Sequence, residues 1–268
     1  MTALLELRDV DFRYRDATDR TLRGVSLVIG PGRSVGIVGA PGSGKTTLLS
    51  VLLGLAAPGR GELLVGAAPV QPGDGEPSRA LRRVVQPVSS SLDPRQRVDL
   101  IVGEPLLSLT PRPGRRARRE HVLKTLDEVG LGHDLARRRP RELTPGQRHR
   151  TGIARALAGS PLVLVADEPL AGLDLSTSIE VIGLLTRIRR TRGLGMAIAA
   201  RDPRTAAALC DDLLVLDEGA VVEAGPTRQV LASPRSEVTR RLLAGIPRLG
   251  AAPPGPGGRA AARPPSTR

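Results

Sequence analysis

An eight-residue glycine-rich stretch constrains this chain more than any other feature. Its residues, Gly39-Ala40-Pro41-Gly42-Ser43-Gly44-Lys45-Thr46, fit the pattern G-x-x-x-x-G-K-[ST]. Apolar runs at 34–38 and 47–55 flank it, which gives the strand, turn and helix context of a phosphate-binding loop. In such a loop, backbone N–H groups and the helix N-terminus surround the phosphates, and a lysine adds positive charge. The alternative is a glycine-rich turn with an incidental lysine.

Lysine is rare in this chain, which gives Lys45 more weight. Only Lys45 and Lys124 are lysines among the 40 basic residues, and the others are arginines. The net charge of +13 invites a nucleic-acid or membrane-surface partner, but the arginines are scattered without interleaved aromatic residues. Abundant Ala, Gly, Pro and Arg together indicate the coding bias of a GC-rich genome. We therefore expect no nucleic-acid partner.

Composition indicates a globular chain of one large domain or two small ones. Its 268 residues are 40% hydrophobic, but Phe12 and Tyr14 are the only aromatic residues, so Leu, Val, Ile and Ala must form the core. A single cysteine, Cys210, excludes an internal disulfide. Since there is no leader-like segment and no apolar run of about 18 residues, we expect a cytosolic chain that does not itself span a membrane.

Alternating strand and helix patterns predict a mainly parallel sheet with both faces covered. The run Leu162 to Ala166 is continuously apolar, as in a parallel strand buried on both faces, and we expect it beside the strand 34–38. The predicted strands are 4–7, 25–29, 34–38, 61–66, 162–166 and 194–200, with a closing hairpin of 213–216 and 220–222. The predicted helical segments are 47–55, 98–109, 115–129, 147–157, 176–190 and 205–210, and 67–78 is a predicted surface loop.

Two acids end the predicted strand 162–166 and suggest the second element of a nucleotide site. Asp167 would hold Mg²⁺, and Glu168 would polarise a water molecule. Two acids at the end of a strand can also simply begin a turn. Lys45 and Thr46 in the same chain favour the nucleotide site.

Over residues 3 to 247, the order and spacing of several motifs resemble the ATP-binding subunits of ABC transporters. Residues 39–46 match Walker A, residues 162–168 match Walker B with its catalytic glutamate, Gln86 matches the Q-loop and Asp174 lies in the D-loop match 171–174. Residues 143–147 stand where the family has Leu-Ser-Gly-Gly-Gln. The resemblance implies these ATP-binding residues: Tyr14, Gly39, Ala40, Pro41, Gly42, Ser43, Gly44, Lys45, Thr46 and Thr47.

The same resemblance implies the remaining roles at the site. Thr46, Gln86 and Asp167 would bind Mg²⁺, while Glu168, Gln86 and Arg201 would act in hydrolysis. Tyr14 would stack on adenine, although a partly buried tyrosine at a strand end is the alternative. In the family, the Q-loop glutamine also lies against the coupling helix of the membrane subunit. The signature residues Thr144, Pro145, Gly146 and Gln147 would face the ATP of a partner domain.

Two stretches narrow the resemblance to the ATPases of oligopeptide, dipeptide and nickel importers. One is residues 86–95, with Ser-Leu-Asp-Pro-Arg at its end, and the other begins at Gly225-Pro226-Thr227 and ends at Pro247. Val238 stands where that subgroup usually has tyrosine, and Pro87-Val88 replaces its usual Asp-Pro. The resemblance therefore implies peptides, or a related small solute such as nickel, as the transported substrate.

Two departures from the family pattern concern hydrolysis. The position of the family's switch histidine is Arg201, and no histidine follows Walker B in the sequence. A guanidinium can clamp a phosphate but cannot accept a hydrogen bond as a neutral imidazole can. Pro145 replaces the first signature glycine and removes one N–H, although Thr144, Pro145 and Gln147 still predict a helix start with a capping box. We expect nucleotide binding to be less affected than turnover.

The resulting expectation is a P-loop NTPase core, with an antiparallel β-rich N-terminal subdomain and a helical subdomain. The expected ABC domain is 1–246, with core segments 1–92 and 160–225, a helical subdomain at about 93–159 and an extension at 226–246; 247–268 would be a disordered tail. The expected function is that of an ATP-binding, ATP-hydrolysing importer subunit that uses Mg²⁺ on the cytoplasmic side of the membrane. The alternative is a nucleotide-binding but catalytically impaired subunit.

The resemblance also implies the partners of the chain. These are integral membrane permease subunits, a second ABC ATPase subunit and, indirectly, an extracytoplasmic solute-binding protein. Each ATP in the family lies between the phosphate loop of one domain and the signature of the other. A homodimer would combine both departures in each site, whereas a heterodimer would place one in each. We therefore expect a heterodimer.

Overall fold

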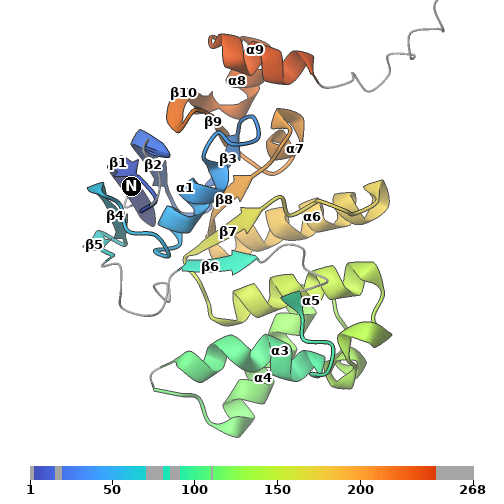
Figure 1. Cartoon of the computed structure of the whole chain (residues 1–268). Helices are drawn as coiled ribbons and strands as arrows, with labels where there is room; N and C mark the ends of the chain where they lie inside the picture. The colour runs from blue at the N-terminus through green and yellow to red at the C-terminus, as the bar shows by residue number, and fades with distance from the viewer. Residues whose placement is uncertain (1–2, 16–19, 71–80, 85–90, 110, 246–268) are drawn as a thin grey trace, which may run out of the picture.

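The computed structural model describes residues 3–15, 20–70, 81–84, 91–109 and 111–245. Two sheets and a group of helices make up this part of the chain (Figure 1). The predicted tail 247–268 and the Q-loop residue Gln86 lie outside the described residues. The mixture of an antiparallel sheet, a mainly parallel sheet and separate helices confirms the predicted fold class.

The smaller sheet is antiparallel and has the order β2-β1-β4-β5. On β2, the buried side chains Leu22, Val25, Leu27 and Ile29 point to the core between exposed neighbours. This alternation is typical of a strand with one covered face. The strands are β1 (Leu5–Phe12), β2 (Leu22–Ile29), β4 (Arg60–Val65) and β5 (Ala68–Pro69).

The larger sheet carries the predicted phosphate loop after β3 and has the order β10-β9-β3-β8-β7-β6. Every residue of β3 and β8 is buried, because α1 (Lys45–Leu52) and α6 (Leu175–Arg192) are among the helices that accompany this sheet. All pairs are parallel except β10 with β9. The strands are β3 (Ser34–Val38), β6 (Leu81–Val84), β7 (Val163–Asp167), β8 (Gly195–Ala199), β9 (Asp212–Asp217) and β10 (Ala220–Pro226).

The predicted neighbour of the phosphate-loop strand is wrong. β7 does not lie beside β3, because β8 pairs with both of them and separates them. A buried apolar run shows that a strand is covered on both faces, but it carries no information about which strand is next to it. Here the crossover helix α6 follows β7, and the next strand, β8, lies between β7 and β3.

The described residues between β6 and β7 include a series of helical segments. They are α3 (Val98–Gly103), η1 (Glu104–Ser108), α4 (Arg115–Glu128), η2 (His133–Arg137), η3 (Pro140–Glu142) and α5 (Pro145–Ala158). The predicted single helix 98–109 is thus two shorter segments, because Pro105 near the start of η1 cannot continue the hydrogen-bonding of α3. None of the helices among the described residues is long and apolar enough to cross a membrane.

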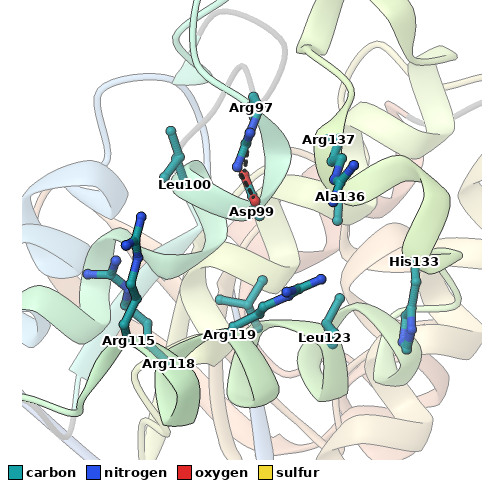
Figure 2. Close-up of a pocket in the computed structure, with 11 residues that line it drawn as sticks. Arg97, Asp99, Leu100, Arg115, Arg118, Arg119, Leu123, His133, Ala136 and Arg137 are labelled. Atoms are coloured by element: carbon teal, nitrogen blue, oxygen red, sulfur yellow. Dashed lines mark hydrogen bonds and ion pairs between the residues drawn. The ribbon is translucent and has the colours of Figure 1, made fainter.

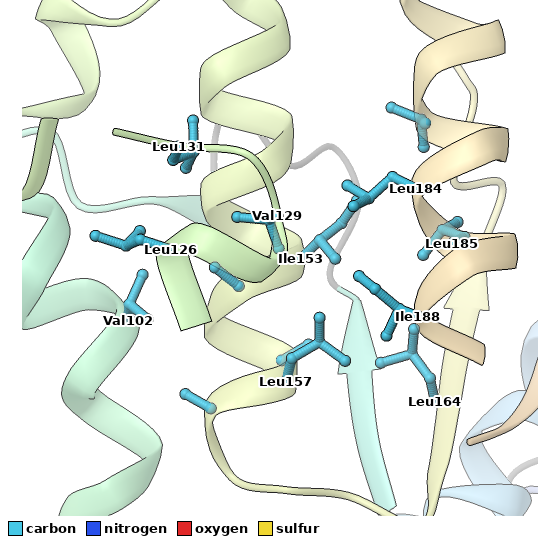
Figure 3. Close-up of a cluster of buried hydrophobic side chains, with 14 of the residues drawn as sticks. Val102, Leu126, Val129, Leu131, Ile153, Leu157, Leu164, Leu184, Leu185 and Ile188 are labelled. Atoms are coloured by element: carbon cyan, nitrogen blue, oxygen red, sulfur yellow. The ribbon is translucent and has the colours of Figure 1, made fainter. Parts of the chain in front are cut away.

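One aliphatic core joins these helices to the parallel sheet. Figure 3 shows Ile153 and Leu157 of α5 between Leu126 of α4 on one side and Ile188 of α6 on the other. Leu164 of β7 belongs to the same cluster. The position of α5 is therefore tied to that of the strand that ends in Asp167.

The C-terminal extension contributes α8 and α9, which share a small hydrophobic core with the preceding helix α7. α7 (Pro203–Ala207), α8 (Thr227–Ala232) and α9 (Glu237–Ala244) surround Ala206 and Val230, and Leu242 packs against this cluster. The Glu223 carboxylate on β10 accepts hydrogen bonds from Arg235 N, Ser236 N and the buried Thr239 hydroxyl. These bonds fix the start of α9 against the edge strand.

Gly36, in the middle of β3, lets α7 approach the sheet. A Cβ atom there would lie 2.8 Å from Leu213 Cδ2 and 2.9 Å from Ala206 Cβ. We expect Gly36→Ala to lower the free energy of unfolding by about 1–3 kcal/mol, measured by urea titration. Gly183→Ala is the matched control, because Gly183 is an exposed residue of α6 and nothing lies within 4 Å of the added Cβ. This change should raise the free energy of unfolding by about 0.5–1 kcal/mol. Equal effects of the two variants would contradict this packing argument.

His149 on α5 provides a pH dependence of stability. The side chain is buried, its Nε2 has no hydrogen-bond partner among the described residues, and its ring bonds the backbone of Pro169. Burial lowers the pKa of His149, and the Pro169 bond opposes this only in part.

The folded state therefore binds this proton less readily than the unfolded chain. Neutral His149 contributes its full stabilisation above the pKa of histidine in the unfolded chain, which is about 6.5. As the pH falls below this pKa, the free energy of unfolding decreases by at most about 1.4 kcal/mol per pH unit. We expect urea titrations between pH 8 and 5 to show a shallower loss for His149→Gln. Parallel pH profiles for both proteins would contradict the buried neutral histidine.

Candidate functional site

The turn between β3 and α1 is shaped by close backbone packing. A Cβ atom at Gly39 would lie 2.3 Å from the carbonyl oxygen of Leu216, so only glycine fits there. Gly42 and Gly44 have φ angles of 81° and 102°, which other residues rarely adopt. The turn leads directly into α1, which begins at Lys45. Its N-terminal N–H groups and helix dipole can therefore face an anion.

Lys45 lies across this turn and is already hydrogen-bonded. Its ammonium group donates to the carbonyl oxygens of Gly39 and Ala40, both at 2.8 Å, and lies 3.4 Å from Ser43 Oγ. Burial lowers the pKa of Lys45, while Asp167 and Glu168 oppose that shift and Arg201 adds to it. The lysine is thus a positive charge held at the mouth of the loop.

Two acids reach the same place from β7. Asp167 is the last residue of that strand, and its Oδ2 lies 3.4 Å from the hydroxyl oxygen of Thr46 at the start of α1. A hydroxyl and a carboxylate oxygen are ligands of the kind that Mg²⁺ prefers. The two residues are therefore chemically suited to hold this ion, although they come from segments 121 residues apart.

Glu168 follows with an unusual backbone conformation. Its φ is +49°, a value that is uncommon for residues other than glycine. Its N–H donates to Ala199 O at 2.8 Å, and its carbonyl accepts from Ala171 N at 2.9 Å. Its carboxylate forms a 2.6 Å ion pair with Arg201 Nε, and the hydrogen bond in this pair is the main cause of the raised pKa of Arg201.

These residues line one pocket of about 850 Å³. Its wall combines the phosphate loop with both acids of β7 and with Arg201 from the segment after β8. Leu242 of α9 also lines it, which sequence reasoning missed because nothing in the pattern of that helix indicates which pocket it faces. The lining residues are Gly39, Ala40, Pro41, Gly42, Lys45, Thr46, Asp167, Glu168, Ala171, Gly172, Arg201 and Leu242.

Tyr14 lies beside the start of α1 but does not line this pocket. Its hydroxyl is 3.1 Å from Thr47 Oγ1, and its ring meets Phe12 edge-on at a centroid distance of 4.8 Å. Half of the side chain is exposed, at 50%. Its place beside the phosphate-loop helix leaves a ring surface open to a base, and adenine stacking stays a prediction.

The signature residues begin α5 and lie apart from the pocket. Thr144 and Gln147 form the predicted capping box, with Gln147 N donating to Thr144 Oγ1 at 3.2 Å and Thr144 N donating to Gln147 Oε1 at 3.0 Å. Pro145 occupies the first helical turn, and Gly146 follows it. None of the four residues lines the pocket that contains Lys45 and Asp167.

Asp174, the predicted D-loop residue, caps the start of α6. It accepts hydrogen bonds from Thr177 N at 2.9 Å and from the Thr177 hydroxyl at 2.7 Å, and these bonds lower the pKa of Asp174. Beyond it, Leu175 and Ile179 are unusually exposed aliphatic residues.

A second pocket, of about 550 Å³, lies in the helical region and is rich in arginine (Figure 2). Arg115, Arg118 and Arg119 reach it from α4, and Figure 2 shows Arg97 bonded to Asp99 at its rim. Among the described residues, the three α4 arginines have no ion-pair partner. We name this set the arginine pocket; its lining is Arg97, Asp99, Leu100, Arg115, Arg118, Arg119, Val122, Leu123, His133, Ala136 and Arg137.

Comparison with known proteins adds relatives of similar length. The chain is 38% identical over 251 residues to the "Putrescine export system ATP-binding protein SapF" of Escherichia coli K12 and to the "Peptide transport system ATP-binding protein SapF" of Salmonella typhimurium. Each match covers 90% of this chain and 93% of the relative. The "Nickel import ATP-binding protein NikE" of Rhodospirillum rubrum is 35% identical, with coverage of 88% and 87%.

Solved structures agree with the sequence relatives. cbiO1 of Clostridium perfringens, described as part of the ABC transporter complex cbiONQ, has a TM-score of 0.79 at 27% identity and covers 87% of this chain and 92% of its own. The ATP-binding cassette MJ0796, described as bound to ADP and Pi, has a TM-score of 0.72 at 27% identity, with coverage of 84% and 99%.

The sequence model described as "ABC transporter" matches residues 22–171, a span that contains the phosphate loop and both acids of β7. This match, the identity above 30% over nine-tenths of the chain and the geometry of the pocket agree with one another. The chain therefore belongs to the ABC transporter family, as one of its ATP-binding subunits.

Proposed function

We propose that this protein hydrolyses ATP to drive an ABC importer of peptides or of a related small solute such as nickel. One observation carries the proposal: a single pocket brings together the phosphate loop, Lys45, Thr46, Asp167 and Glu168. The names of the SapF and NikE relatives support peptides or nickel as the solute. One SapF relative is named for putrescine export, so uptake of these solutes is itself part of the proposal.

Each residue of the pocket takes a distinct part in this function. Lys45 and the loop N–H groups hold the phosphates, and Thr46 and Asp167 hold Mg²⁺, as their 3.4 Å separation and oxygen ligands allow. When bound, Mg²⁺ would neutralise phosphate charge. Glu168 orients and polarises a water molecule by accepting its hydrogen bond. Gln86 keeps its predicted role in sensing the ion and coupling to the membrane subunit.

We further propose that the active form is a heterodimer on the cytoplasmic side of the membrane. The signature residues at the start of α5 do not line the chain's own pocket, so they are available to a second domain. Thr144 and Gln147 still complete a regular helix start, with only the N–H at Pro145 missing. Losing one such donor costs on the order of 10²–10³ in rate. A partner with an unaltered signature would supply the missing donor at this chain's own pocket, and that site would then support turnover.

The arginine pocket is the surface that we propose for docking of the permease subunits. The α4 arginines supply positive charge, while Leu100 and Leu123 add apolar side chains to the same pocket. Leu100 is 50% exposed and so offers an apolar side chain to a partner. An acidic segment with one apolar side would satisfy both properties.

The ATPase assignment predicts separate effects for two pocket substitutions. Lys45→Ala should weaken ATP binding at least tenfold, because it removes the charge held over the loop, and Glu168→Gln should keep binding but lower turnover at least a hundredfold. Binding is measured by equilibrium titration and turnover by phosphate release, for the chain alone and with its co-purified partner subunits.

The same measurements test the rival proposal of an impaired subunit that binds ATP without hydrolysing it. None of the relatives' names points to such impairment. If Glu168→Gln left phosphate release of the complex unchanged, the hydrolytic role of this chain would be wrong. Unchanged ATP binding by Lys45→Ala would contradict the site itself.

The docking proposal predicts an effect on assembly alone. The double variant Arg115→Glu/Arg119→Glu reverses charge at two exposed arginines of the arginine pocket, and it should lose co-purification of the membrane subunits because an acidic segment would be repelled. ATP binding by the isolated chain should stay within twofold. Arg190→Glu/Arg228→Glu makes the same charge change at exposed residues outside both pockets. Equal loss in both double variants would argue against this docking surface.

A further inference from the structure

The backbone around Arg201 is fixed, although its side chain is not. Ala200 N donates to Ile37 O at 3.0 Å, which ties the segment after β8 to the phosphate-loop strand. On the other side, Asp202 caps α7 by accepting from Arg204 N at 2.8 Å. The guanidinium is therefore held at one edge of the nucleotide pocket and can change partners only by side-chain rotation.

That guanidinium uses little of its hydrogen-bonding capacity. Its side chain is 82% exposed, and Nε is engaged by Glu168 at 2.6 Å. Among the described residues its two terminal nitrogens have no hydrogen-bond or ion-pair partner. A guanidinium carries five N–H donors in a planar fork that matches phosphate oxygens. Arg201 can therefore bind a phosphate group more completely than it binds Glu168.

Glu168 cannot withdraw from this ion pair by moving its backbone. Both its N–H and its carbonyl are hydrogen-bonded, to Ala199 and Ala171, and its side chain is only 25% exposed. The positive charge of Arg201 beside the Glu168 carboxylate offsets the negative charge of that group, so it polarises water less effectively. The ion pair therefore restrains the group that would polarise the attacking water.

The other cation of the pocket, Lys45, already has hydrogen-bond partners. Lys45 bonds two carbonyl oxygens of the loop and approaches Ser43, whereas the Arg201 pair is exposed, and exposed pairs are easily broken. Charge-assisted, bidentate contacts of arginine with phosphate are stronger than a single contact with a carboxylate. Of the two cations that line the pocket, Arg201 is thus the one whose partner a bound phosphate can change.

From these contacts we propose that Arg201 is a latch on Glu168 that opens when a nucleotide supplies a terminal phosphate. In the latched state Arg201 holds the Glu168 carboxylate. In the open state the guanidinium binds the γ-phosphate, and the freed carboxylate accepts a hydrogen bond from water. ADP has one phosphate fewer to compete for the guanidinium, so the latch makes the site prefer ATP. This role of Arg201 rests on the proposed ATPase function and adds to it.

The latch is tested by comparing affinities for ADP and for a non-hydrolysable ATP analogue by calorimetry. Arg201→Gln should weaken binding of the analogue about tenfold, because one charged phosphate contact is lost, and should leave ADP affinity within twofold. Arg201→Lys should recover part of the preference for the analogue, since it keeps the charge but not the fork. Arg228→Gln, at an exposed arginine of α8 outside the pocket, is the control for charge alone.

A double-mutant cycle with Glu168→Gln tests the ion pair itself. If the pair exists only before the terminal phosphate binds, the cycle for the analogue should show a coupling of about two- to fivefold in affinity, and the cycle for ADP should show none. Equal weakening of both nucleotides by Arg201→Gln, or no coupling for the analogue, would overturn the latch. A wild-type protein that bound neither nucleotide would instead overturn the proposed function.

Discussion

The nucleotide site depends on how β3 is held in the middle of the parallel sheet. β3 pairs with β8 on one side and β9 on the other, and a Cβ atom at Gly36 or Gly39 would collide with atoms of β9, namely Leu213 Cδ2 and Leu216 O. The turn that follows is consequently bounded by backbone atoms, including Leu216 O. Lys45 closes it by bonding two of its carbonyls. This packing preorganises the loop before any phosphate arrives.

The pocket contains two basic and two acidic side chains, and their pairing determines which cation is available to a bound anion. Lys45 and Arg201 face Asp167 and Glu168 across the same cavity. Lys45 is half-buried and bonded to the loop, whereas Arg201 is exposed and bonded to an acid. An incoming phosphate therefore finds one cation that is fixed and one that can exchange its partner. In the proposed latch, a group of permanent charge, Arg201, stands at the family's histidine position, and an ion pair takes the place of a hydrogen-bonding switch.

Packed side chains connect this site to the helical segments around α5 on one side and to the C-terminal helix α9 on the other. The aliphatic cluster of Ile153, Leu157 and Ile188 ties the signature helix α5 to β7 and α6, so the helical segments and the acids share one core. At the other end, Glu223 anchors α9, and Leu242 of that helix lines the nucleotide pocket. Packed side chains therefore link the pocket to α5 on one side and to α9 on the other.

The sequence by itself determined the elements and chemistry that depend on local spacing. The phosphate loop, the acids after a buried strand and the capping box at Thr144 all follow from neighbouring residues. The vacancy of the histidine position follows from the family resemblance and from the absence of any histidine after Walker B. Only the tertiary structure decided that β8 separates β3 from β7, that Arg201 pairs with Glu168, and that Leu242 reaches the pocket. Strand order and long-range contacts arise from how crossovers and faces pack together, and a hydrophobic pattern records that a face is buried without recording its partner.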